Sequence, residues 1–386
     1  MNTFLSETDL SLKNQYEHFA SEQLLSVASA LEDGQSSLKD IFHKLGQGGF
    51  FAITVPKEYG GKGGTFLQLL LLTEAIGHFQ AGVGAALTTH AAVIEAISQF
   101  GTEAQKSRFL PLLARGEIIG TLAHFEEEKQ ILPREVEAQI DSSAGQFKLT
   151  GKKKLVINGA DAGLLLVLAI EKGEGGDAPA LWLVDKSSTS QITVTAEGPF
   201  IGLRSASVCG ITFDNVVLES KDRLGEDGAI TNLSAETTTQ FDYIMSITKT
   251  LLAGVALGIL ESSLKTATDF ARTGERFGQA LAQSQGIQWK LADHGTEASA
   301  SRLLTYRAAW SKDEAPKEFA RNAAMCKSFS ARAARAHSAE AIQVLGPLNV
   351  ESNSSVERFY RDSKMIELIE GSNEQQKILI VKELGI

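Results

Sequence analysis

The sequence predicts an α+β protein in which a strand-rich middle segment separates two helical segments. Three observations support this order. Apolar residues recur at three- and four-residue spacing through residues 1–119, short β-branched runs divided by Gly, Asp and Asn fill residues 120–226, and helical spacing returns over residues 227–386. Strands and helices do not alternate along the chain, so we do not expect a Rossmann-type parallel sheet.

The N-terminal segment carries clear helix signals. The run "SSLKDIFHKLGQGG" starts with serine and ends with glycine, the residue types preferred at the two ends of a helix. The run "TFLQLLLLTEAIGHF" is apolar on nearly all sides, which indicates a central, buried helix. Residues 1–119 are therefore expected to form a helical domain.

The middle segment holds six or seven short runs typical of strands, such as "GLLLVLAI" and "GITFDNVVL". That many short strands predict a small β-barrel or sandwich over residues 120–226. The C-terminal segment, residues 227–386, opens with the long apolar-faced helical run "SITKTLLAGVALGILESSLKTATDFARTG" and continues with further helical runs.

Composition excludes several functional classes. The chain is 43% hydrophobic and 22% charged, which is typical of a soluble globular protein. Its net charge of −10 argues against nucleic-acid binding, because phosphate contacts need clustered Lys and Arg. Cys209 and Cys326 stand alone, and the histidines show no metal-ligand spacing, so no metal site is expected.

The location of the protein is predicted from two further patterns. The N-terminus "MNTFLSETDLSLKNQ" lacks the basic and apolar regions of a signal peptide. Apolar stretches such as "GLLLVLAI" are too short to span a bilayer. We therefore expect a cytoplasmic protein with no membrane span.

One acidic residue near the C-terminus is placed unexpectedly. In "IELIEGSNEQQ", Glu370 lies between an isoleucine and a glycine, in a run apolar enough to be half buried. A buried carboxylate is costly unless it is paired. Glu370 is therefore either an acid that favours the start of the following helix through the helix dipole, or a functional carboxylate.

Five segments, in order along nearly the whole chain, resemble the motifs of one enzyme family, the acyl-CoA dehydrogenases and their flavoprotein relatives. The C-terminal segment is similar to the family's ERxYRD and EGTNEIQ motifs. The five segments are "GGFFAITVPKEYGGKGG", "QFGTEAQKSRFLPLLARGEIIG", "GLRSASVCGITFDNVVL", "RFGQALAQSQGIQWKLAD" and "QVLGPLNVESNSSVERFYRDSKMIELIEGSNEQQ".

The resemblance implies an acyl-CoA dehydrogenase-like fold: an N-terminal helical domain, a middle β-domain and a C-terminal four-helix bundle through which the chains form an oligomer. It implies an oxidoreductase (EC 1.3) that binds FAD and desaturates an acyl thioester between its α and β carbons. By the same resemblance Glu370 is the base that removes the α-proton, while hydride leaves the β-carbon for flavin N5. A flavin is needed because no side chain accepts hydride.

The resemblance also implies two sets of binding residues. Gly371 and Arg204 are expected to contact the substrate. The expected cofactor-binding residues are Phe125, Ile157, Asn158, Arg276, Phe277, Gln343, Gly346, Ser372 and Glu374.

Several of these positions depart from the family pattern, so the chain resembles a divergent member. Phe125 and Ile157 stand where the family has threonines near the flavin. Gly274 takes the place of the arginine that meets the pyrophosphate, with Arg276 two residues later, and Pro347 replaces the second glycine of a diglycine. Each lost hydrogen bond costs ~1 kcal/mol, so FAD binding is expected to be weakened.

Two alternatives to a working dehydrogenase follow from these departures. The first is a non-catalytic or half-catalytic subunit that pairs with a different chain and binds FAD weakly or not at all. The second is a flavin-dependent oxidase or monooxygenase on the same fold, because loss of hydroxyls near flavin N5 suits altered oxygen reactivity. The expected partners are acyl-CoA or an acyl-carrier thioester, copies of this or a related chain, and an electron-acceptor flavoprotein.

Four polar features are assigned structural roles. His124 lies in the altered flavin motif and is predicted to be structural. Residues 126–129, "EEEK", are predicted to form a solvated acidic turn. Lys152 to Lys154 form either an exposed basic hairpin or a contact for a CoA phosphate or carrier protein, and Arg361–Asp362 are predicted to form an ion pair near the bundle core.

Overall fold

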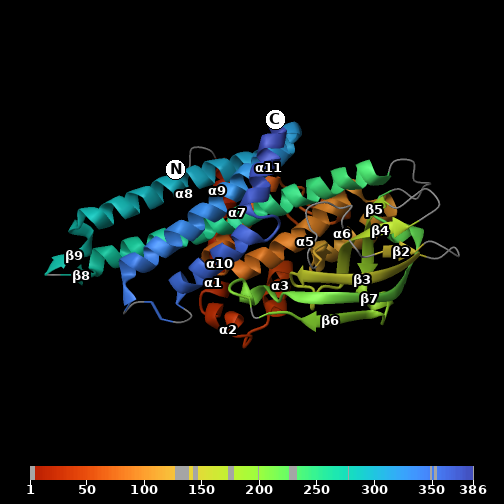
Figure 1. The fold of residues 1–386 in the computed structure, drawn as a ribbon, viewed down its shortest axis with the longest axis horizontal. Coiled ribbons are helices and arrows are strands. Elements are labelled where there is room, and N and C mark those ends of the chain that lie inside the picture. Colours follow the sequence, from red (N-terminus) through yellow and green to blue (C-terminus); the bar gives the residue numbers. More distant parts are fainter. Residues whose placement is uncertain are drawn as a thin grey trace.

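The computed structural model describes residues 5–126, 139–141, 147–172, 178–198, 200–225, 233–276, 278–347, 350–351 and 354–385. Helices precede the sheet and follow it, as predicted, and the sheet occupies one end of an elongated molecule (Figure 1). The long helix α7 (Leu233–Thr273) runs from the end that carries the sheet toward the opposite end, where α8 (Gln285–Glu314) and α9 (Pro316–Leu345) lie beside it.

Among the residues that the structure describes, six α-helices form the N-terminal part. They are α1 (Glu7–Leu24), α2 (Ala28–Glu32), α3 (Leu38–Gln47), α4 (Phe66–Phe79), α5 (Ala81–Phe100) and α6 (Glu103–Ala114). Helix α3 begins after Ser37, whose hydroxyl accepts a hydrogen bond from the Lys39 N–H, and ends before Gly48, as its sequence predicts. Helix α4 is buried on nearly all sides, which confirms the prediction of a central helix.

The middle part is a mixed sheet. Its strands are β1 (Gly120–Ala123), β2 (Gln139–Asp141), β3 (Phe147–Val156), β4 (Leu164–Lys172), β5 (Ala178–Asp185), β6 (Ile192–Ala196) and β7 (Cys209–Leu218). Strand β4 pairs antiparallel with β5 on one side and parallel with β1 and β2 on the other, and β3, β7 and β6 follow in that order.

The strand-rich middle region is thus confirmed, with one difference in its closure. Within the described residues, pairing leaves β5 and β6 as the edges of an open sheet rather than closing a barrel. Alternate residues of β4 enter two different cores: Leu164 and Leu166 join the large core shared with the helices, whereas Leu165 and Val167 join the separate core of the sheet.

The C-terminal part is a helical bundle built around α9. Its helices are α7 (Leu233–Thr273), α8 (Gln285–Glu314), α9 (Pro316–Leu345), α10 (Ser355–Leu368) and α11 (Asn373–Glu383), and α9 packs against the other four. A short hairpin, β8 (Glu275–Arg276) with β9 (Gln279–Ala280), joins α7 to α8.

Helix α7 also packs against α4, and glycines allow the two helices to approach closely. A Cβ atom at Gly77 of α4 would lie 2.5 Å from the Val255 carbonyl oxygen, and one at Gly258 of α7 would lie 2.3 Å from the Glu74 carbonyl oxygen. Side chains at either position would push the helices apart. Helix α7 therefore joins the N-terminal part and the bundle in one core.

Within the described part of the chain, two helices satisfy the length and composition of a membrane span, contrary to the expectation that the apolar stretches are too short. They are α5 and the part of α7 from Thr239 to Thr273. In both, 94% of the apolar window is buried inside the protein, and such burial is characteristic of core helices.

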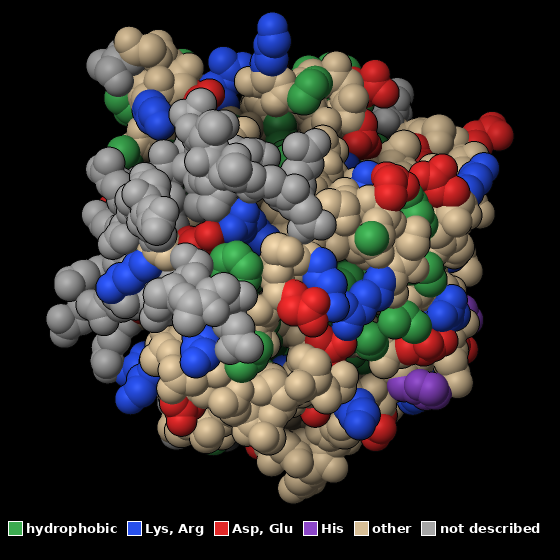
Figure 2. All heavy atoms as spheres, turned by 90° about the vertical axis from the view of Figure 1, so that its right-hand side faces the viewer, with side chains coloured by type: hydrophobic (Ala, Val, Ile, Leu, Met, Phe, Trp, Pro, Cys, Tyr) green, Lys and Arg blue, Asp and Glu red, His purple; other side chains and the backbone are tan. Residues whose placement is uncertain are grey.

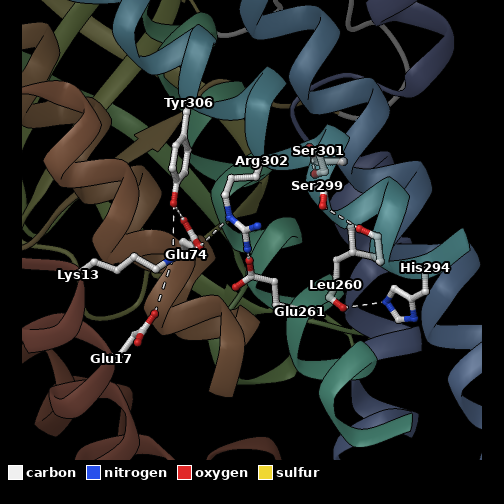
Figure 3. A network of polar contacts seen from close by, with 12 residues as sticks. Lys13, Glu17, Glu74, Leu260, Glu261, His294, Ser299, Ser301, Arg302 and Tyr306 are labelled. Carbon is white, nitrogen blue, oxygen red and sulfur yellow. Dashed lines mark hydrogen bonds and ion pairs between the residues drawn. The ribbon is translucent and has the colours of Figure 1, made fainter. Parts of the chain in front are cut away.

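A buried polar network crosses the boundary between the N-terminal part and the bundle (Figure 3). The Tyr306 hydroxyl of α8 donates a 2.7 Å hydrogen bond to Glu74 of α4, and Lys13 of α1 forms an ion pair with the same carboxylate. Arg302 of α8 lies 3.9 Å from Glu74 and also pairs with Glu261 of α7. The buried charge of Glu74 is thus balanced by groups from two other helices.

A second polar junction joins the bundle to the sheet region. Asp362 of α10 accepts a 2.7 Å hydrogen bond from the Leu203 N–H. Arg361 pairs with Glu357 of its own helix and with Glu32 of α2. The predicted Arg361–Asp362 ion pair was therefore wrong: consecutive helical residues point in different directions, so the two side chains bind different partners.

Candidate functional site

Glu370 lies in the turn between α10 and α11 and has a left-handed backbone conformation. Its φ is +53°, and Gly371 follows with φ of +90°. A non-glycine residue in this region costs of order 1–3 kcal/mol, and such strain concentrates at functional sites. The Glu370 side chain is only 8% exposed. The turn therefore directs a carboxylate into the protein at an energetic cost.

The interpretation of Glu370 as a helix-start acid does not fit this geometry. Ser372 is the N-cap of α11 and forms a capping box with Gln375. Glu374 is the acid of the first helical turn, and hydrogen bonds from its own N–H and from Ser372 lower its pKa. Ser372 and Glu374, both expected to bind the cofactor, thus have capping roles in the helix itself.

His124 brings the end of strand β1 to Glu370. Its Nε2 lies 3.5 Å from Glu370 Oε2, and its ring packs at 5.6 Å from the ring of Phe241 on α7. Burial lowers the pKa of His124, Glu370 opposes this shift and Lys153 adds to it. His124 was predicted to be structural, and this contact places it instead beside the expected base.

Two buried lysines of the bundle also act on Glu370. Lys327 of α9 donates hydrogen bonds to the backbone carbonyls of Glu367, at 3.1 Å, and Gly371, one on each side of Glu370. Burial lowers its pKa to about 7, and Glu370 is the charge that most strongly opposes this shift. Lys249 of α7 is 8% exposed; burial lowers its pKa, and the charges of Asp242 and Glu370 oppose this shift.

Sequence reasoning missed both lysines, although a signal was present. Each is a charged residue within an otherwise apolar or small-residue helical run, "SITKTLLAG" for Lys249 and "AAMCKSFS" for Lys327. Burying an ammonium group is expensive, so a lysine on such a face indicates a buried acceptor or a buried negative charge.

Three of the expected cofactor contacts lie on the neighbouring segments that follow β1 and β3. Phe125 follows His124 directly, and the Thr121 hydroxyl of β1 donates to the carbonyl of Ile157, just after β3. Asn158 is 1% exposed with φ of +57°, and no hydrogen-bond partner for its Oδ1 is present among the described residues. A buried, unused acceptor at this position fits the polar edge of an isoalloxazine ring.

The charged residues around this segment correct two sequence predictions. Glu126 is 5% exposed rather than part of a solvated turn, and it forms an ion pair with Lys153, whose side chain is fully buried. The proposed basic hairpin of Lys152 to Lys154 therefore loses its central lysine to the interior. Lys153 is buried because neighbouring residues of strand β3 alternate between solvent and core, and Glu126, which follows β1, is buried as its ion-pair partner. Of the predicted acidic turn only Glu126 is tested, because residues 127–129 lie outside the described residues.

The other expected cofactor contacts lie at the far end of the bundle. Arg276 of β8 and Gly346, which follows α9, are neighbours: a Cβ atom at Gly346 would lie 3.6 Å from Arg276 Nη2. Gln343 is exposed on the last turn of α9. A left-handed glycine beside an exposed guanidinium leaves room for a phosphate close to the backbone, which fits the pyrophosphate end of FAD. Phe277 lies outside the described residues.

These two groups cannot hold one FAD molecule within one chain. Lys249 of α7 lies near Glu370, and Thr273 ends the same helix shortly before Arg276. The two residues are 24 positions apart, about 36 Å at 1.5 Å per residue. In Figure 1 the hairpin β8–β9 and the sheet lie at opposite ends. The residues present therefore fit FAD as two half-sites.

The expected substrate residues are only partly brought together. Gly371 adjoins Glu370, and its φ of +90° is a conformation that residues with a side chain rarely adopt, so the turn favours glycine there. Arg204 is exposed, and its Nε donates to the Phe200 carbonyl at 3.2 Å. No contact among the described residues links Arg204 to Glu370.

Surface charge and metal ligands give little further indication of function. Figure 2 views the end of the molecule that carries the sheet; outside the grey atoms, acidic and basic side chains are interspersed with small apolar groups. Among the described residues, no cluster of three His, Cys, Asp or Glu side chains is placed to hold a metal ion.

Comparison with known proteins matches all three parts of the chain. Residues 6–117, 127–216 and 239–385 match the models of the N-terminal, middle and C-terminal domains of acyl-CoA dehydrogenases. An acyl-CoA dehydrogenase of Bacillus subtilis is 28% identical over 98% of both chains. The rat mitochondrial short-chain specific acyl-CoA dehydrogenase is 28% identical over 98% of this chain and 90% of its own.

A solved structure agrees with the sequence relatives. The butyryl-CoA dehydrogenase of Megasphaera elsdenii superposes with a TM-score of 0.92, with 25% identity and full coverage of both chains. The similarity therefore extends over the helical parts, the sheet and the turn that carries Glu370.

Proposed function

Because the chain belongs to the acyl-CoA dehydrogenase family of FAD-dependent oxidoreductases, we propose that it desaturates an acyl thioester with Glu370 as the base. The observation that carries the proposal is the buried, left-handed Glu370, held next to the strand ends that would bind the flavin. The chain has glutamate at this position although glycine or asparagine would adopt the same backbone conformation with less strain.

Removal of the α-proton requires a base that is held at reacting distance in a site without water. An α-proton beside a thioester is weakly acidic, so the carboxylate has to be placed within about 3–3.5 Å of the reacting carbon. The turn around Glu370 is fixed by Lys327 from α9 and by the hydrogen bonds of Gln376 to the Glu370 and Gly371 carbonyls. Glu370 would take the α-proton and become a neutral carboxylic acid.

FAD supplies the acceptor for the hydride that leaves the β-carbon. Phe125, Ile157 and Asn158 would line the isoalloxazine end, with Asn158 Oδ1 available to accept a hydrogen bond from the ring. Arg276 and the backbone at Gly346 would receive the pyrophosphate end. The departures from the family motif remain, so we expect FAD to bind less tightly than in relatives that keep the threonine hydroxyls.

The separation of the two half-sites supports an oligomer in which a second copy completes each FAD site. Helix α8 offers a surface for such an assembly. Trp289, Leu303 and Trp310 are each at least half exposed and lie 14 and 7 positions apart, so they share one face of the helix. A homo-oligomer is therefore proposed over a pairing with a different, flavin-binding chain.

The substrate and acceptor are proposed by class. The thioester is acyl-CoA, with an acyl-carrier thioester as the second candidate, and a flavoprotein that accepts electrons would reoxidise the reduced enzyme. The full-length similarity to dehydrogenases and the retained Glu370 favour a dehydrogenase over the oxidase or monooxygenase and over the non-catalytic subunit considered from the sequence.

The test combines bound flavin with anaerobic reduction. We expect the purified chain to carry FAD, and we expect short-chain acyl-CoA to bleach this flavin under anaerobic conditions. The variant Glu370→Gln should bind FAD, but its flavin should bleach at least about 10²-fold more slowly. Glu383→Gln, a change to an exposed acid at the C-terminal end of α11, is the matched control and should bleach at the normal rate. Normal bleaching in Glu370→Gln would remove this residue from the role of base.

A further inference from the structure

We propose that His124 is a positioning residue for Glu370, whose imidazole holds one carboxylate oxygen so that the other faces the substrate. This inference rests on the proposed function, because it assigns His124 a role in the work of the base. His124 is not among the residues that the family resemblance assigns to the site.

The geometry of the contact is specific to one oxygen. His124 Nε2 faces Glu370 Oε2 at 3.5 Å, and both side chains are largely buried, at 14% and 8% exposure. Among the described residues, no hydrogen bond is made to Glu370 Oε2. The His124 nitrogen lies close to this oxygen, but the distance is longer than that of a normal hydrogen bond. Such contacts are often long without substrate and shorten when it binds. A neutral imidazole with its proton on Nε2 would donate to Oε2 and leave Oε1 to take the α-proton.

The imidazole is itself held in place from two sides. Its ring packs against Phe241 of α7 at 5.6 Å, and the His124 carbonyl lies 3.5 Å from Lys153 Nζ, whose ammonium pairs with Glu126. The ion pair between β3 and the residues that follow β1 thus fixes the backbone at His124. A base on a turn is in this way oriented by a residue anchored to the sheet.

The charged groups around the pair come from four elements. Glu370 lies on the turn, Lys153 on β3, and Lys249 and Asp242 on α7, while Lys327 lies on α9. Burial and Lys153 lower the pKa of His124, and Glu370 alone raises it. The imidazole is therefore neutral at neutral pH and acts as a hydrogen-bond donor rather than as a counter-ion.

The contact is tested first without turnover. Histidine C2 resonances of the purified holoenzyme, labelled with ¹³C-histidine, are titrated in the wild type and in Glu370→Gln, and the His124 signal is identified by its loss in His124→Gln. Because the carboxylate stabilises the imidazolium, we expect a lower pKa for His124 in Glu370→Gln. His18, which lies 3.2 Å from Glu22 on the surface, is the internal control, and its C2 resonance should be the same in both proteins. An unchanged His124 pKa would overturn the contact.

The positioning role is tested by kinetics. His124→Leu is expected to lower kcat by about 10- to 100-fold with little change in KM, because orientation of the base matters only in the chemical step. His124→Gln, whose amide nitrogen can occupy the place of Nε2, should recover part of kcat. His18→Leu, which removes an exposed imidazole from an equivalent pair, should leave kcat unchanged.

The outcomes separate this inference from the proposed function. If Glu370→Gln keeps full activity, the proposed base is wrong, whatever the titration shows. If Glu370→Gln is inactive but His124→Leu and His124→Gln both keep the wild-type kcat, the function stands and the positioning role is overturned. An equal decrease of kcat/KM in both His124 variants that comes from a raised KM, with kcat unchanged, would also overturn the positioning role. It would indicate that His124 contacts the substrate.

Discussion

In the turn between α10 and α11, Glu370 has a strained backbone that lowers stability and directs its carboxylate into the protein. Glu370 has φ of +53°, a conformation that glycine adopts freely and glutamate does not. Gly371 follows directly, and a glycine at position 370 as well would form this turn without backbone strain. A carboxylate here instead points to a chemical use, and Lys249, Lys327 and His124 supply the environment that a buried carboxylate needs.

The strain at Glu370 can be measured by comparing two substitutions that both remove the charge. Glu370→Gln keeps the strained backbone, whereas Glu370→Gly relieves it, so we expect the free energy of unfolding to be higher in Glu370→Gly by about 1 kcal/mol. Urea denaturation of the two variants measures the difference. A glycine variant less stable than the glutamine variant would show that this turn is not strained.

At the scale of elements, helix α9 fixes the turn that carries Glu370 through one side chain. Lys327 reaches across the bundle and donates to carbonyls on both sides of Glu370, so the position of the turn depends on the packing of α9 against α10 and α11. Its ammonium is buried, and desolvation lowers its pKa from 10.5 to about 7. The same lysine therefore couples the turn to pH.

The pH dependence has a definite sign. Between about pH 7 and pH 10.5 the unfolded chain binds a proton at Lys327 that the folded chain does not, so stability should rise with pH across this window. Lys327→Met removes that rise, and it also lowers stability by about 1–3 kcal/mol because two buried carbonyls lose their donor.

Denaturant unfolding at several pH values checks this expectation. Lys377→Met, which removes an exposed lysine of α11, is the matched control and should keep the wild-type pH dependence. A Lys327→Met variant whose stability still rises as in the wild type would assign the rise to another group.

At the scale of the whole molecule, the three parts are joined by buried polar contacts as well as by the apolar core. The Glu74 network links α1, α4, α7 and α8, and Asp362 links α10 to the segment before β7. Burial, together with the charge of Glu32, raises the pKa of Asp362 to about 7, while the Leu203 N–H and two arginines oppose the shift. The junction between bundle and sheet is therefore sensitive to mildly acidic pH.

Asp362 predicts a pH dependence opposite to that of Lys327. Between its ordinary pKa of 3.8 and about 7, folded Asp362 holds a proton that the unfolded chain has released, so its contribution to stability falls as pH rises. Asp362→Asn keeps an acceptor for the Leu203 N–H and should flatten this part of the stability profile. Asp214→Asn, at an exposed position of β7, should leave the profile unchanged. An equally steep profile in Asp362→Asn would contradict the assignment.

The sequence by itself determined the order of helices and strands, the caps of α3, the buried character of α4 and the candidate base. These features depend on local patterns: periodicity reports the buried face of an element, and Ser or Gly at its ends satisfies or permits the terminal backbone. Motifs with fixed spacing also carried the family resemblance, including Glu370.

The tertiary structure alone decided what surrounds the candidate base and where the expected cofactor contacts lie. His124 and Glu370 are distant along the chain, and only the packing of β1 against the bundle brings them within 3.5 Å. Burial of Lys153 with Glu126, and the distance of Arg276 and Gly346 from the turn, likewise follow from how elements pack and how long α7 is. A one-dimensional pattern shows which residues face inward, but which buried charges meet is fixed by the assembled core.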